Sequence, residues 1–342
     1  MTHGEQARAR IAFVGAGNHS TASLYPNIAQ IPEFDLACVC DLDEDKARDV
    51  AARFGARAWY TDVEAMLDQE PPDGVCVCGQ PEMHHVVALQ ALQRGIPVFV
   101  EKPPAPTLAQ ARELAATATR QGTWGMVGFM KRFAPANLVA LDYMGSQAFG
   151  DLSSITLIHG SGPYDDMRRM LMFNGIHMID TARFLAGDVA SVFAVASGAD
   201  RAVQAISVAM RFASGAVGQL NMNSGHSWQD CFEQVYISGS ESGLVIDASQ
   251  AVEVMSQQRE FARPEGPSLF GFSGRYYVSG NMAGWEAGGH YTRGYWGELS
   301  RFARAVCGLD APGPTLEDAV AAMSLIDAIM GSAEQSRPVS PA

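Results

Sequence analysis

Residues 173–180 read FNGIHMID and contain two side chains that could handle a proton, His177 and Asp180. They stand three positions apart, so on a helix they lie on the same face. Histidine titrates near neutral pH and is the residue that most often takes up or releases a proton in catalysis. The same pair also occurs as a hydrogen-bonded pair inside a core, and these eight residues alone leave both interpretations open.

A lysine, Lys102, follows an apolar run in the stretch VFVEKPPAP, residues 98–106. A strand that ends in Glu-Lys-Pro places the lysine at the carboxyl edge of its sheet. Ligands of open parallel sheets bind at that edge. An exposed lysine at a strand end is the commoner case in isolation, so the neighbouring elements decide whether Lys102 takes part in chemistry.

The loop GAGNHS, residues 15–20, is typical of a dinucleotide site, because it follows one apolar run and opens a helix. Gly15 and Gly17 match the first two glycines of that pattern, whereas Ser20 replaces the third. Backbone N–H groups at such a helix start, here around Asn18 and His19, can hold a pyrophosphate. A tight turn without a ligand is the alternative. The third glycine serves mainly helix–strand packing, which a serine can tolerate.

Asp41 ends the next apolar run and bears on the choice of cofactor. A carboxylate at this position accepts from a ribose 2′-hydroxyl and repels a 2′-phosphate. The residues that follow, 42–45, add negative charge and no arginine. We therefore predict NAD rather than NADP as the cofactor.

The first part of the chain alternates short apolar runs with helices, which predicts a doubly wound parallel sheet covered on both faces. Strands are expected at 10–17, 35–41, 74–79, 97–102 and 125–129. Gly55 and Gly95 close two of the helices. Thr61 with Glu64 and Thr107 with Gln110 form capping boxes at two helix starts.

The second part is built from strands in quick succession around one helix, at about 175–186. Their alternation of apolar and polar residues is typical of an antiparallel sheet with one covered face. These strands are expected at 152–159, 189–197, 203–212, 216–223, 232–239 and 243–248, with closing helices at 296–308 and 315–333. Residues 257–295 have no clear periodicity and indicate a lid, a binding loop or an oligomer contact.

We therefore predict an α/β chain of two domains, residues 1–130 with the doubly wound sheet and residues 131–342 with a large, mostly antiparallel open sheet. The first binds the dinucleotide and the second the substrate, and the last helices are able to pack back on the first domain. The first domain ends after the expected strand at 125–129, and the helices become sparse from about residue 151.

The composition excludes some classes of function. Of 342 residues, 47% are hydrophobic, and the net charge of −13 leaves no basic stripe for nucleic acid. No stretch reaches the roughly 20 apolar residues of a membrane helix, and the first ten residues do not resemble a secretory signal, so we expect a cytoplasmic protein. Cys-Val-Cys at 38–40 and 76–78 puts two sulfurs on one face of a strand, which indicates buried thiols rather than disulfides or a metal site.

Taken together, the order and spacing of these motifs resemble the glucose-fructose oxidoreductase / inositol dehydrogenase / MocA (Gfo/Idh/MocA) family over nearly the whole chain. The resemblance rests on GAGNHS with Asp41, Pro81 with His84, VFVEKP, GFMKRF (128–133), GIHMID and GYWGELSRFARAVCG (294–308). It implies a Rossmann domain and a C-terminal sheet that packs against partner subunits, as a homodimer or homotetramer. It also implies hydride transfer between a nicotinamide and a sugar, cyclitol or related polyol.

The resemblance also implies roles for individual residues. Lys102 would bond the reacting hydroxyl, and His177 would act as the general acid/base. Asp180 would contact a neighbouring substrate hydroxyl, with Lys131 or Arg132 at the pocket rim. The residues expected at the cofactor are Gly15, Gly17, Asn18, His19, Asp41, Gly79, His84, Glu101 and Lys102. Those expected at the substrate are Asp180, Asn174, Arg132, Tyr164 and Tyr291.

One position departs from the family pattern. The family usually has an aspartate four residues before the histidine, where this chain has Phe173. A phenylalanine cannot orient the imidazole, so Asp180, Asn174 or a residue of another segment (Tyr164, Asp165 or Tyr291) takes over, or the proton is handled differently. Two alternatives therefore stay open. They are an NAD-retaining glycoside-cleaving enzyme of the same family and a non-catalytic sensor that binds the cofactor.

Overall fold

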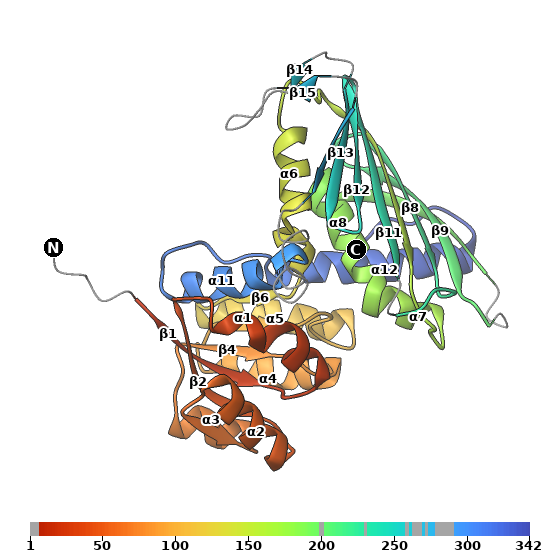
Figure 1. Ribbon diagram of the computed structural model, residues 1–342. Helices are drawn as coiled ribbons and strands as arrows, with labels where there is room; N and C mark the ends of the chain where they lie inside the picture. The colour runs from red at the N-terminus through yellow and green to blue at the C-terminus, as the bar shows by residue number, and fades with distance from the viewer. Residues whose placement is uncertain are drawn as a thin grey trace. The chain divides into compact units, whose positions relative to one another are not determined.

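The computed structural model describes residues 7–197, 202–228, 231–256, 260–261, 269–270, 273–277 and 291–342. The chain divides into two compact units (Figure 1). Unit 1 contains residues 1–130 and 294–321, and unit 2 contains residues 131–293 and 322–342. Most of the segment 257–295, for which we expected a lid, loop or oligomer contact, lies outside the described residues.

Unit 1 is built on a six-stranded parallel sheet with the order β3-β2-β1-β4-β5-β6. Its strands are β1 (Ala9–Val14), β2 (Phe34–Cys40), β3 (Ala58–Tyr60), β4 (Gly74–Val77), β5 (Val98–Val100) and β6 (Gly125–Val127). The central strands read as unbroken apolar runs because both of their faces are buried. The strand order reverses between β1 and β4, and such a reversal opens a crevice at the carboxyl ends.

Local sequence signals set the helix ends of unit 1. Its helices are α1 (Tyr25–Ile28), α2 (Glu44–Phe54), α3 (Val63–Gln69), α4 (Pro81–Gln93), α5 (Leu108–Gln121) and α11 (Tyr295–Val306). Gly55 ends α2 in the left-handed conformation, with φ of 80°. Thr107 begins α5 by accepting the N–H of Gln110, as expected. The predicted cap at Thr61 is wrong by one residue, because Asp62 accepts the N–H of Ala65 at 2.7 Å.

Unit 2 is built on an eight-stranded sheet with the order β16-β13-β12-β11-β7-β10-β9-β8. Its strands are β7 (Leu152–Gly160), β8 (Val189–Ala196), β9 (Ala205–Phe212), β10 (Val217–Asn223), β11 (Phe232–Gly239), β12 (Ser242–Asp247), β13 (Ala251–Ser256) and β16 (Ser273–Tyr277). All neighbours are antiparallel except β7 and β10. A separate two-stranded sheet joins β14 (Glu260–Phe261) and β15 (Leu269–Phe270). The expected fold class is therefore confirmed.

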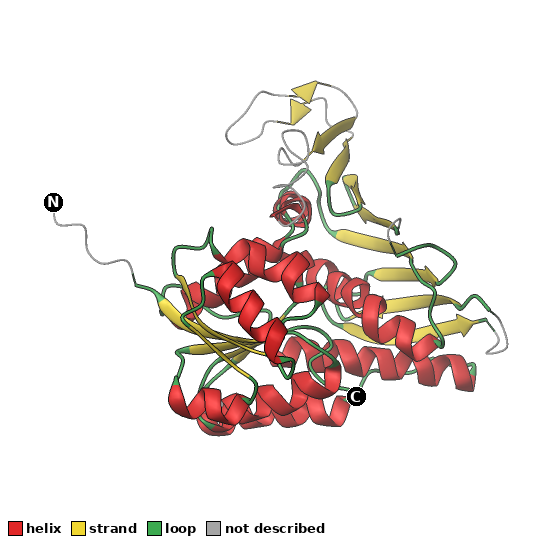
Figure 2. Cartoon of the chain, turned by 60° about the horizontal axis from the view of Figure 1, so that its bottom comes forward, coloured by secondary structure: helices red, strands yellow, loops and turns green. Residues whose placement is uncertain are grey.

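Helices cover one face of the large sheet. They are α6 (Pro135–Met144), α7 (Met167–Met170), α8 (Ile176–Ala186) and the C-terminal part of α12 (Leu316–Gln335). Among them, α8 packs against β7, and α6 packs against β12 and β13 (Figures 1 and 2). The opposite face carries exposed apolar side chains, namely Phe193, Val195, Val217, Phe232, Tyr236 and Met255. We call this set the outer face of the sheet.

The six cysteines are free thiols, and those of the two Cys-Val-Cys stretches are buried, as predicted for these four. Cys38 and Cys40 lie in β2, Cys76 in β4 and Cys78 just after it, and all four are buried, whereas Cys231 is exposed. Burial raises the pKa of Cys38 and of Cys40 to about 12, so both stay protonated at neutral pH. No group of three metal-ligating side chains occurs among the described residues, and no helix there is long and apolar enough to span a bilayer.

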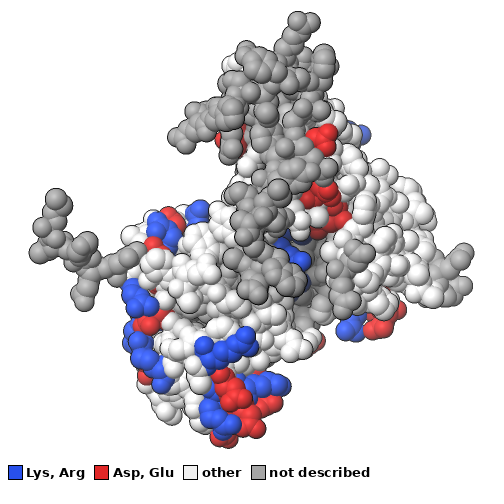
Figure 3. Space-filling view, in the orientation of Figure 1, with Lys and Arg blue, Asp and Glu red and all other residues white. Residues whose placement is uncertain are grey.

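Charged side chains of both signs are interspersed where they are visible on unit 1 (Figure 3). On α2, Lys46 pairs with Asp43, and Arg48 pairs with Asp45 and Asp49. The face in Figure 3 has no continuous stripe of Lys and Arg across the described residues of unit 1.

Candidate functional site

The two glycines of the loop in unit 1 differ in the space around them: Gly15 has no room for a side chain, whereas Gly17 does. Gly15 has φ of +110°, and a Cβ there would lie 1.9 Å from the carbonyl oxygen of Cys78, so no other residue fits. A Cβ on Gly17 would meet nothing within 4 Å, and its backbone has no positive φ. No described protein contact demands a glycine at position 17, whereas close approach of a ligand to the loop backbone would.

Ser20, which replaces the third glycine, fits into the loop because its side chain is buried and hydrogen-bonded. It is buried, and its hydroxyl donates to the carbonyl oxygen of Gly17 at 2.9 Å. Ser20 also begins a π-helical turn, η1 (Ser20–Leu24), ahead of α1. Such turns occur frequently at functional sites because they displace the helix register locally.

Asp41 ties the end of β2 to the glycine loop. One carboxylate oxygen accepts the N–H of Ala16 at 2.7 Å, and the other accepts the N–H of Asp43 at 3.0 Å. Each carboxylate oxygen can accept a further hydrogen bond. The partly exposed Asp41 can therefore hold the loop and still accept from the hydroxyls of a ribose.

Glu101 lies buried behind Lys102 at the carboxyl end of β5. Its Oε2 accepts the backbone N–H of Lys102 at 3.0 Å, and its Oε1 lies 3.4 Å from Nε2 of His19. Burial by itself raises the pKa of Glu101, but the hydrogen bond and charge of His19 and the charge of Lys102 outweigh it, so the pKa is lowered. A carboxylate fixed beneath Lys102 favours the charged form of that lysine.

The buried His84 joins two turns near the same edge of the sheet by hydrogen bonds. Its Nε2 accepts the N–H of Gly79 at 2.8 Å, and its Nδ1 donates to the carbonyl oxygen of Pro103 at 2.8 Å. Burial lowers the pKa of His84 to about 4, so the ring is neutral at physiological pH. His84 thus holds the Gly79 turn at a fixed distance from the Lys102–Pro103 turn.

A buried carboxylate near this edge gave no sequence signal. Glu298 lies in α11 with an exposed fraction of 0%, and neither oxygen has a hydrogen-bond partner among the described residues. Burial first, and then the charge of Glu101, raises its pKa well above the ordinary value. Burial thus favours the protonated form of this carboxyl group. The sequence pattern of α11 gives no indication that this glutamate is buried, because a charged residue in a helix is normally expected at the surface.

In unit 2, α8 buries both members of the opening pair, His177 and Asp180. Asp180 is 1% exposed, and Arg132 grips both of its carboxylate oxygens, at 2.7 and 2.9 Å. A forked pair of this kind fixes both side chains. The carboxylate of Asp180 is therefore held by Arg132, from the 3₁₀ turn η2 (Met130–Phe133).

The turn before His177 is a second π-helical turn, η3 (Leu171–Gly175). Within it, the ring of Phe173 lies 5.4 Å from the guanidinium carbon of Arg169, which also binds the carboxylate of Asp165 at 2.9 Å. Asn174, the next residue, donates to the hydroxyl of Ser161 at 2.6 Å. At the position of the family aspartate, the chain thus has an aromatic ring stacked with an arginine, with an amide beside it.

The two tyrosines that we expected at the substrate lie in different surroundings. Tyr164 is buried, with its ring centroid 4.6 Å from that of Trp228 in an edge-to-face arrangement. Burial raises the pKa of Tyr164 to about 12. Tyr291 is 50% exposed.

A cluster of polar side chains inside unit 2 was missed. Lys131, which we expected at a pocket rim, is buried and bonded to Glu233 of β11, with His159 of β7 beside that carboxylate. One signal could have found the cluster. Both Glu233 and His159 occupy positions at which their alternating strands point inward.

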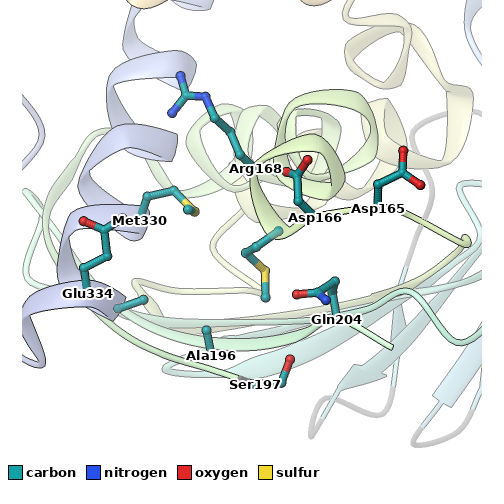
Figure 4. Close-up of a pocket in the computed structure, with 10 residues that line it drawn as sticks. Asp165, Asp166, Arg168, Ala196, Ser197, Gln204, Met330 and Glu334 are labelled. Carbon is teal, nitrogen blue, oxygen red and sulfur yellow. The ribbon is translucent and has the colours of Figure 1, made fainter. Parts of the chain in front are cut away.

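A cavity of about 380 Å³ lies at another place in unit 2 (Figure 4). Its lining residues come from α7 and the turn before it, from the ends of β8 and the β8–β9 connection, and from the last turns of α12. Asp165 lines it, but His177, Asn174, Asp180 and Arg132 do not. The cavity is therefore not the site that the sequence predicts.

Comparison with known proteins gives a consistent result. Residues 9–129 match the model of the Gfo/Idh/MocA oxidoreductase family's NAD-binding Rossmann fold, and residues 167–340 match that of its C-terminal alpha/beta domain. The chain is 29% identical over 196 residues to the D-glucoside 3-dehydrogenase of Escherichia coli, covering 52% of this chain and 54% of that enzyme. The chain thus spans about half the length of that curated relative.

Two further proteins match along nearly their whole length. The myo-inositol 2-dehydrogenase of Thermotoga maritima is 24% identical over 345 residues, covering 96% of this chain and 98% of that enzyme. The crystal structure of a dehydrogenase from Chromobacterium violaceum superimposes with a TM-score of 0.86 at 23% identity, covering 97% of both chains. At this identity, the structural likeness shows the fold.

The two family models cover residues 9–129 and 167–340, and they agree with the glycine loop, the strand order and the large mixed sheet. The first unit carries the NAD-binding Rossmann fold, which confirms the predicted cofactor. The chain belongs to the Gfo/Idh/MocA family of oxidoreductases.

Proposed function

We propose that this protein is an NAD-dependent dehydrogenase or reductase that transfers hydride between the nicotinamide and a hydroxyl or keto carbon of a sugar, sugar derivative or cyclitol. The observation that carries the proposal is the position of Lys102, directly after β5 and backed by the buried Glu101, in the same unit as the glycine loop. The relatives, a glucoside and an inositol dehydrogenase, act on substrates of this class according to their names.

The residues of unit 1 fit NAD. The open space over Gly17 suits the pyrophosphate, with the amides near Asn18 and His19 as donors. Asp41 suits the ribose hydroxyls, whereas a 2′-phosphate would face its charge. When bound, NAD supplies the hydride acceptor or donor. Gly79, His84 and Glu101 complete the proposed cofactor site by fixing the turns around Lys102.

The proposed chemistry needs two groups from the protein. The ammonium of Lys102 donates a hydrogen bond to the oxygen on the reacting carbon and stabilises the negative charge that develops there. His177 accepts the hydroxyl proton in the oxidation and returns it in the reduction. Around them, the substrate would contact Asn174, Arg132, Tyr164 and Tyr291, and Asp180 would act indirectly by orienting Arg132.

The test combines binding and turnover. Calorimetric titration should show NADH binding much more tightly than NADPH, and absorbance should report NADH formation from NAD with a sugar or cyclitol. Lys102→Met should abolish turnover and leave NADH affinity within about twofold, a change below 0.5 kcal/mol. Lys46→Met, at an exposed lysine on α2, is the matched control and should behave as the wild type. Unchanged turnover in Lys102→Met would refute the proposal.

Phe173 favours one second candidate, an enzyme that retains NAD and cleaves a glycoside. Its ring, 5.4 Å from the guanidinium carbon of Arg169, occupies the position from which the family aspartate would reach the histidine, so this candidate handles the proton differently. Release of an aglycone without net NADH would identify this activity. Cofactor binding without hydride transfer to any polyol would instead identify a sensor.

We also propose a homodimer or homotetramer that forms through the outer face of the unit 2 sheet, in the cytoplasm and without nucleic-acid or membrane partners. The exposed Phe193, Val195 and Tyr236 on that face support an apolar contact, since contiguous exposed apolar area marks interaction sites. Light scattering should give a mass above one chain. The double variant Phe193→Asp, Tyr236→Asp should reduce it to that of one chain.

A further inference from the structure

We propose that Asn174 is a fixed hydrogen-bond acceptor for a substrate hydroxyl, held in place by a buried chain of side chains formed by Ser161, His159, Glu233 and Lys131. This inference rests on the proposed function and deepens it. It assigns positioning roles to residues of β7, β11 and η2, and it states which chemical group of the substrate meets Asn174. We call the five residues the Asn174 chain.

The charged end of the Asn174 chain is an ion pair inside unit 2. The ammonium of Lys131 lies 2.6 and 2.5 Å from the two carboxylate oxygens of Glu233, and the hydroxyl of Ser249 donates to Oε1 at 3.0 Å. All three side chains are buried. Burial alone would raise the pKa of Glu233, but the charge of Lys131, together with the influence of His159, outweighs it and holds the pKa well below its usual range. This end therefore carries a permanent carboxylate.

The middle of the chain is the ring of His159. Its Nδ1 lies 3.6 Å from Oε2 of Glu233, and its Nε2 lies 3.0 Å from the hydroxyl oxygen of Ser161. His159 and Ser161 are both buried. Nδ1 has no hydrogen-bond partner among the described residues, so the ring is hydrogen-bonded to the hydroxyl of Ser161 and lies within ion-pair distance of the carboxylate of Glu233.

The direction of these hydrogen bonds follows from the donors that each group has. The amide nitrogen of Asn174 can only donate, so the oxygen of Ser161 accepts from it at 2.6 Å. We assign the hydroxyl hydrogen of Ser161 to Nε2 of His159 at 3.0 Å, because the carboxylate of Glu233, 3.6 Å from Nδ1, favours a hydrogen on that other ring nitrogen. The ring therefore carries its hydrogen on Nδ1, the nitrogen that faces the carboxylate of Glu233.

This direction determines what Asn174 can offer a ligand. Since its amide nitrogen is held by Ser161, the carbonyl oxygen is turned away from that hydrogen bond. Asn174 is partly exposed and stands three residues before His177, in the turn that precedes α8. A carbonyl oxygen accepts from a hydroxyl and disfavours a carboxylate. The substrate group that meets Asn174 is therefore a hydroxyl rather than a carboxylate.

The first test reads the histidine itself and needs no substrate. Long-range ¹H–¹⁵N NMR spectra of the ring should show a hydrogen on Nδ1 of His159 and none on Nε2. Ser161→Ala should change that spectrum because Nε2 loses its donor. Ser207→Ala, which removes a hydroxyl bonded to Asn221 on the opposite face of the same sheet, is the matched control and should not. A ring with hydrogen on Nε2 in the wild type would overturn the inference.

The second test reads substrate discrimination. In the wild type, replacing the polyol by its deoxy analogue, which lacks the hydroxyl next to the reacting carbon, should lower kcat/KM by about 10- to 100-fold, as expected for one lost hydrogen bond to a built site. In Ser161→Ala and in Asn174→Ala, the difference in kcat/KM between the polyol and its deoxy analogue should fall to about threefold or less. They should raise KM for the polyol more than they lower kcat, and leave NADH affinity unchanged.

The outcomes separate the two proposals. Full wild-type discrimination in Ser161→Ala, or a sugar acid preferred over the neutral polyol, would refute the role of the Asn174 chain while hydride transfer stands. If the ring form is as stated but no polyol is oxidised or reduced, the proposed function fails and the assignment of the substrate group fails with it.

Discussion

The neutral, buried ring of His84 predicts a specific dependence of stability on pH in unit 1. Burial lowers its pKa from the ordinary 6.5 to about 4, so between these values the unfolded chain binds a proton that the folded chain does not. The contribution of His84 to the free energy of unfolding is therefore fully present above pH 6.5 and decreases as the pH falls from 6.5 towards 4. At about pH 5 the loss is about 2 kcal/mol, since each pH unit below 6.5 contributes about 1.4 kcal/mol.

The assay compares the wild type with His84→Gln at about pH 7.5 and about pH 5. Hydrogen exchange of the amides in β4 and β5, read by mass spectrometry, gives the opening free energy of unit 1. Other titrating groups are common to both proteins, so their effects cancel in the difference. The wild type should lose about 2 kcal/mol more than His84→Gln on acidification. At the higher pH, His84→Gln should be less stable by about 1–3 kcal/mol, because it disturbs the bonds to Gly79 and Pro103. Equal losses in both proteins would show that His84 is protonated in the folded chain and would refute the reasoning.

Three further predictions concern the glycine loop and the buried ion pair. Gly15→Ala should destabilise unit 1 by roughly 2 kcal/mol or more, because of its positive φ and its clash with the backbone, and thermal unfolding would show it. Gly17→Ala should keep wild-type thermal stability but lower NADH affinity at least about tenfold by calorimetry. Unchanged affinity would contradict the proposal that the pyrophosphate occupies the open space over Gly17. Lys131→Met should destabilise unit 2 by about 3–5 kcal/mol in urea, since it leaves Glu233 charged and buried. Arg168→Ala, which removes an exposed ion pair, should lower the free energy of unfolding by less than about 1 kcal/mol. Equal losses in Lys131→Met and Arg168→Ala would refute the distinction between the buried and the exposed ion pair.

Local signals predicted most of the elements from the sequence. The glycine at position 55 has the left-handed conformation that ends α2, and Thr107 begins α5 where its capping box indicates. The prediction at Thr61 failed by one residue because Thr61 and Asp62 are both good caps. Asp62 is the residue whose side chain meets the free N–H of Ala65.

The polar interior of unit 2 could not be predicted in the same way. Lys131 and Glu233 are 102 residues apart, and their contact depends on the placement of η2 beside β11, which no local pattern encodes. The sequence placed Asn174 among the candidates but not its partner. The hydrogen bond to Ser161 requires the π-helical turn η3, whose register a regular helical pattern does not reveal.

The buried position of four of the six thiols makes the protein suitable for selective labelling. The sulfurs in and next to β2 and β4 are closed to solvent and protonated, and therefore inert toward maleimides. The exposed Cys231 belongs to unit 2, and the partly exposed Cys307 belongs to unit 1. Native chemistry thus supplies one attachment point for a fluorophore on each unit, with Cys231 reacting first. Energy transfer between the two dyes would report, without any engineered cysteine, whether the distance between the two labelled sites changes when NADH binds.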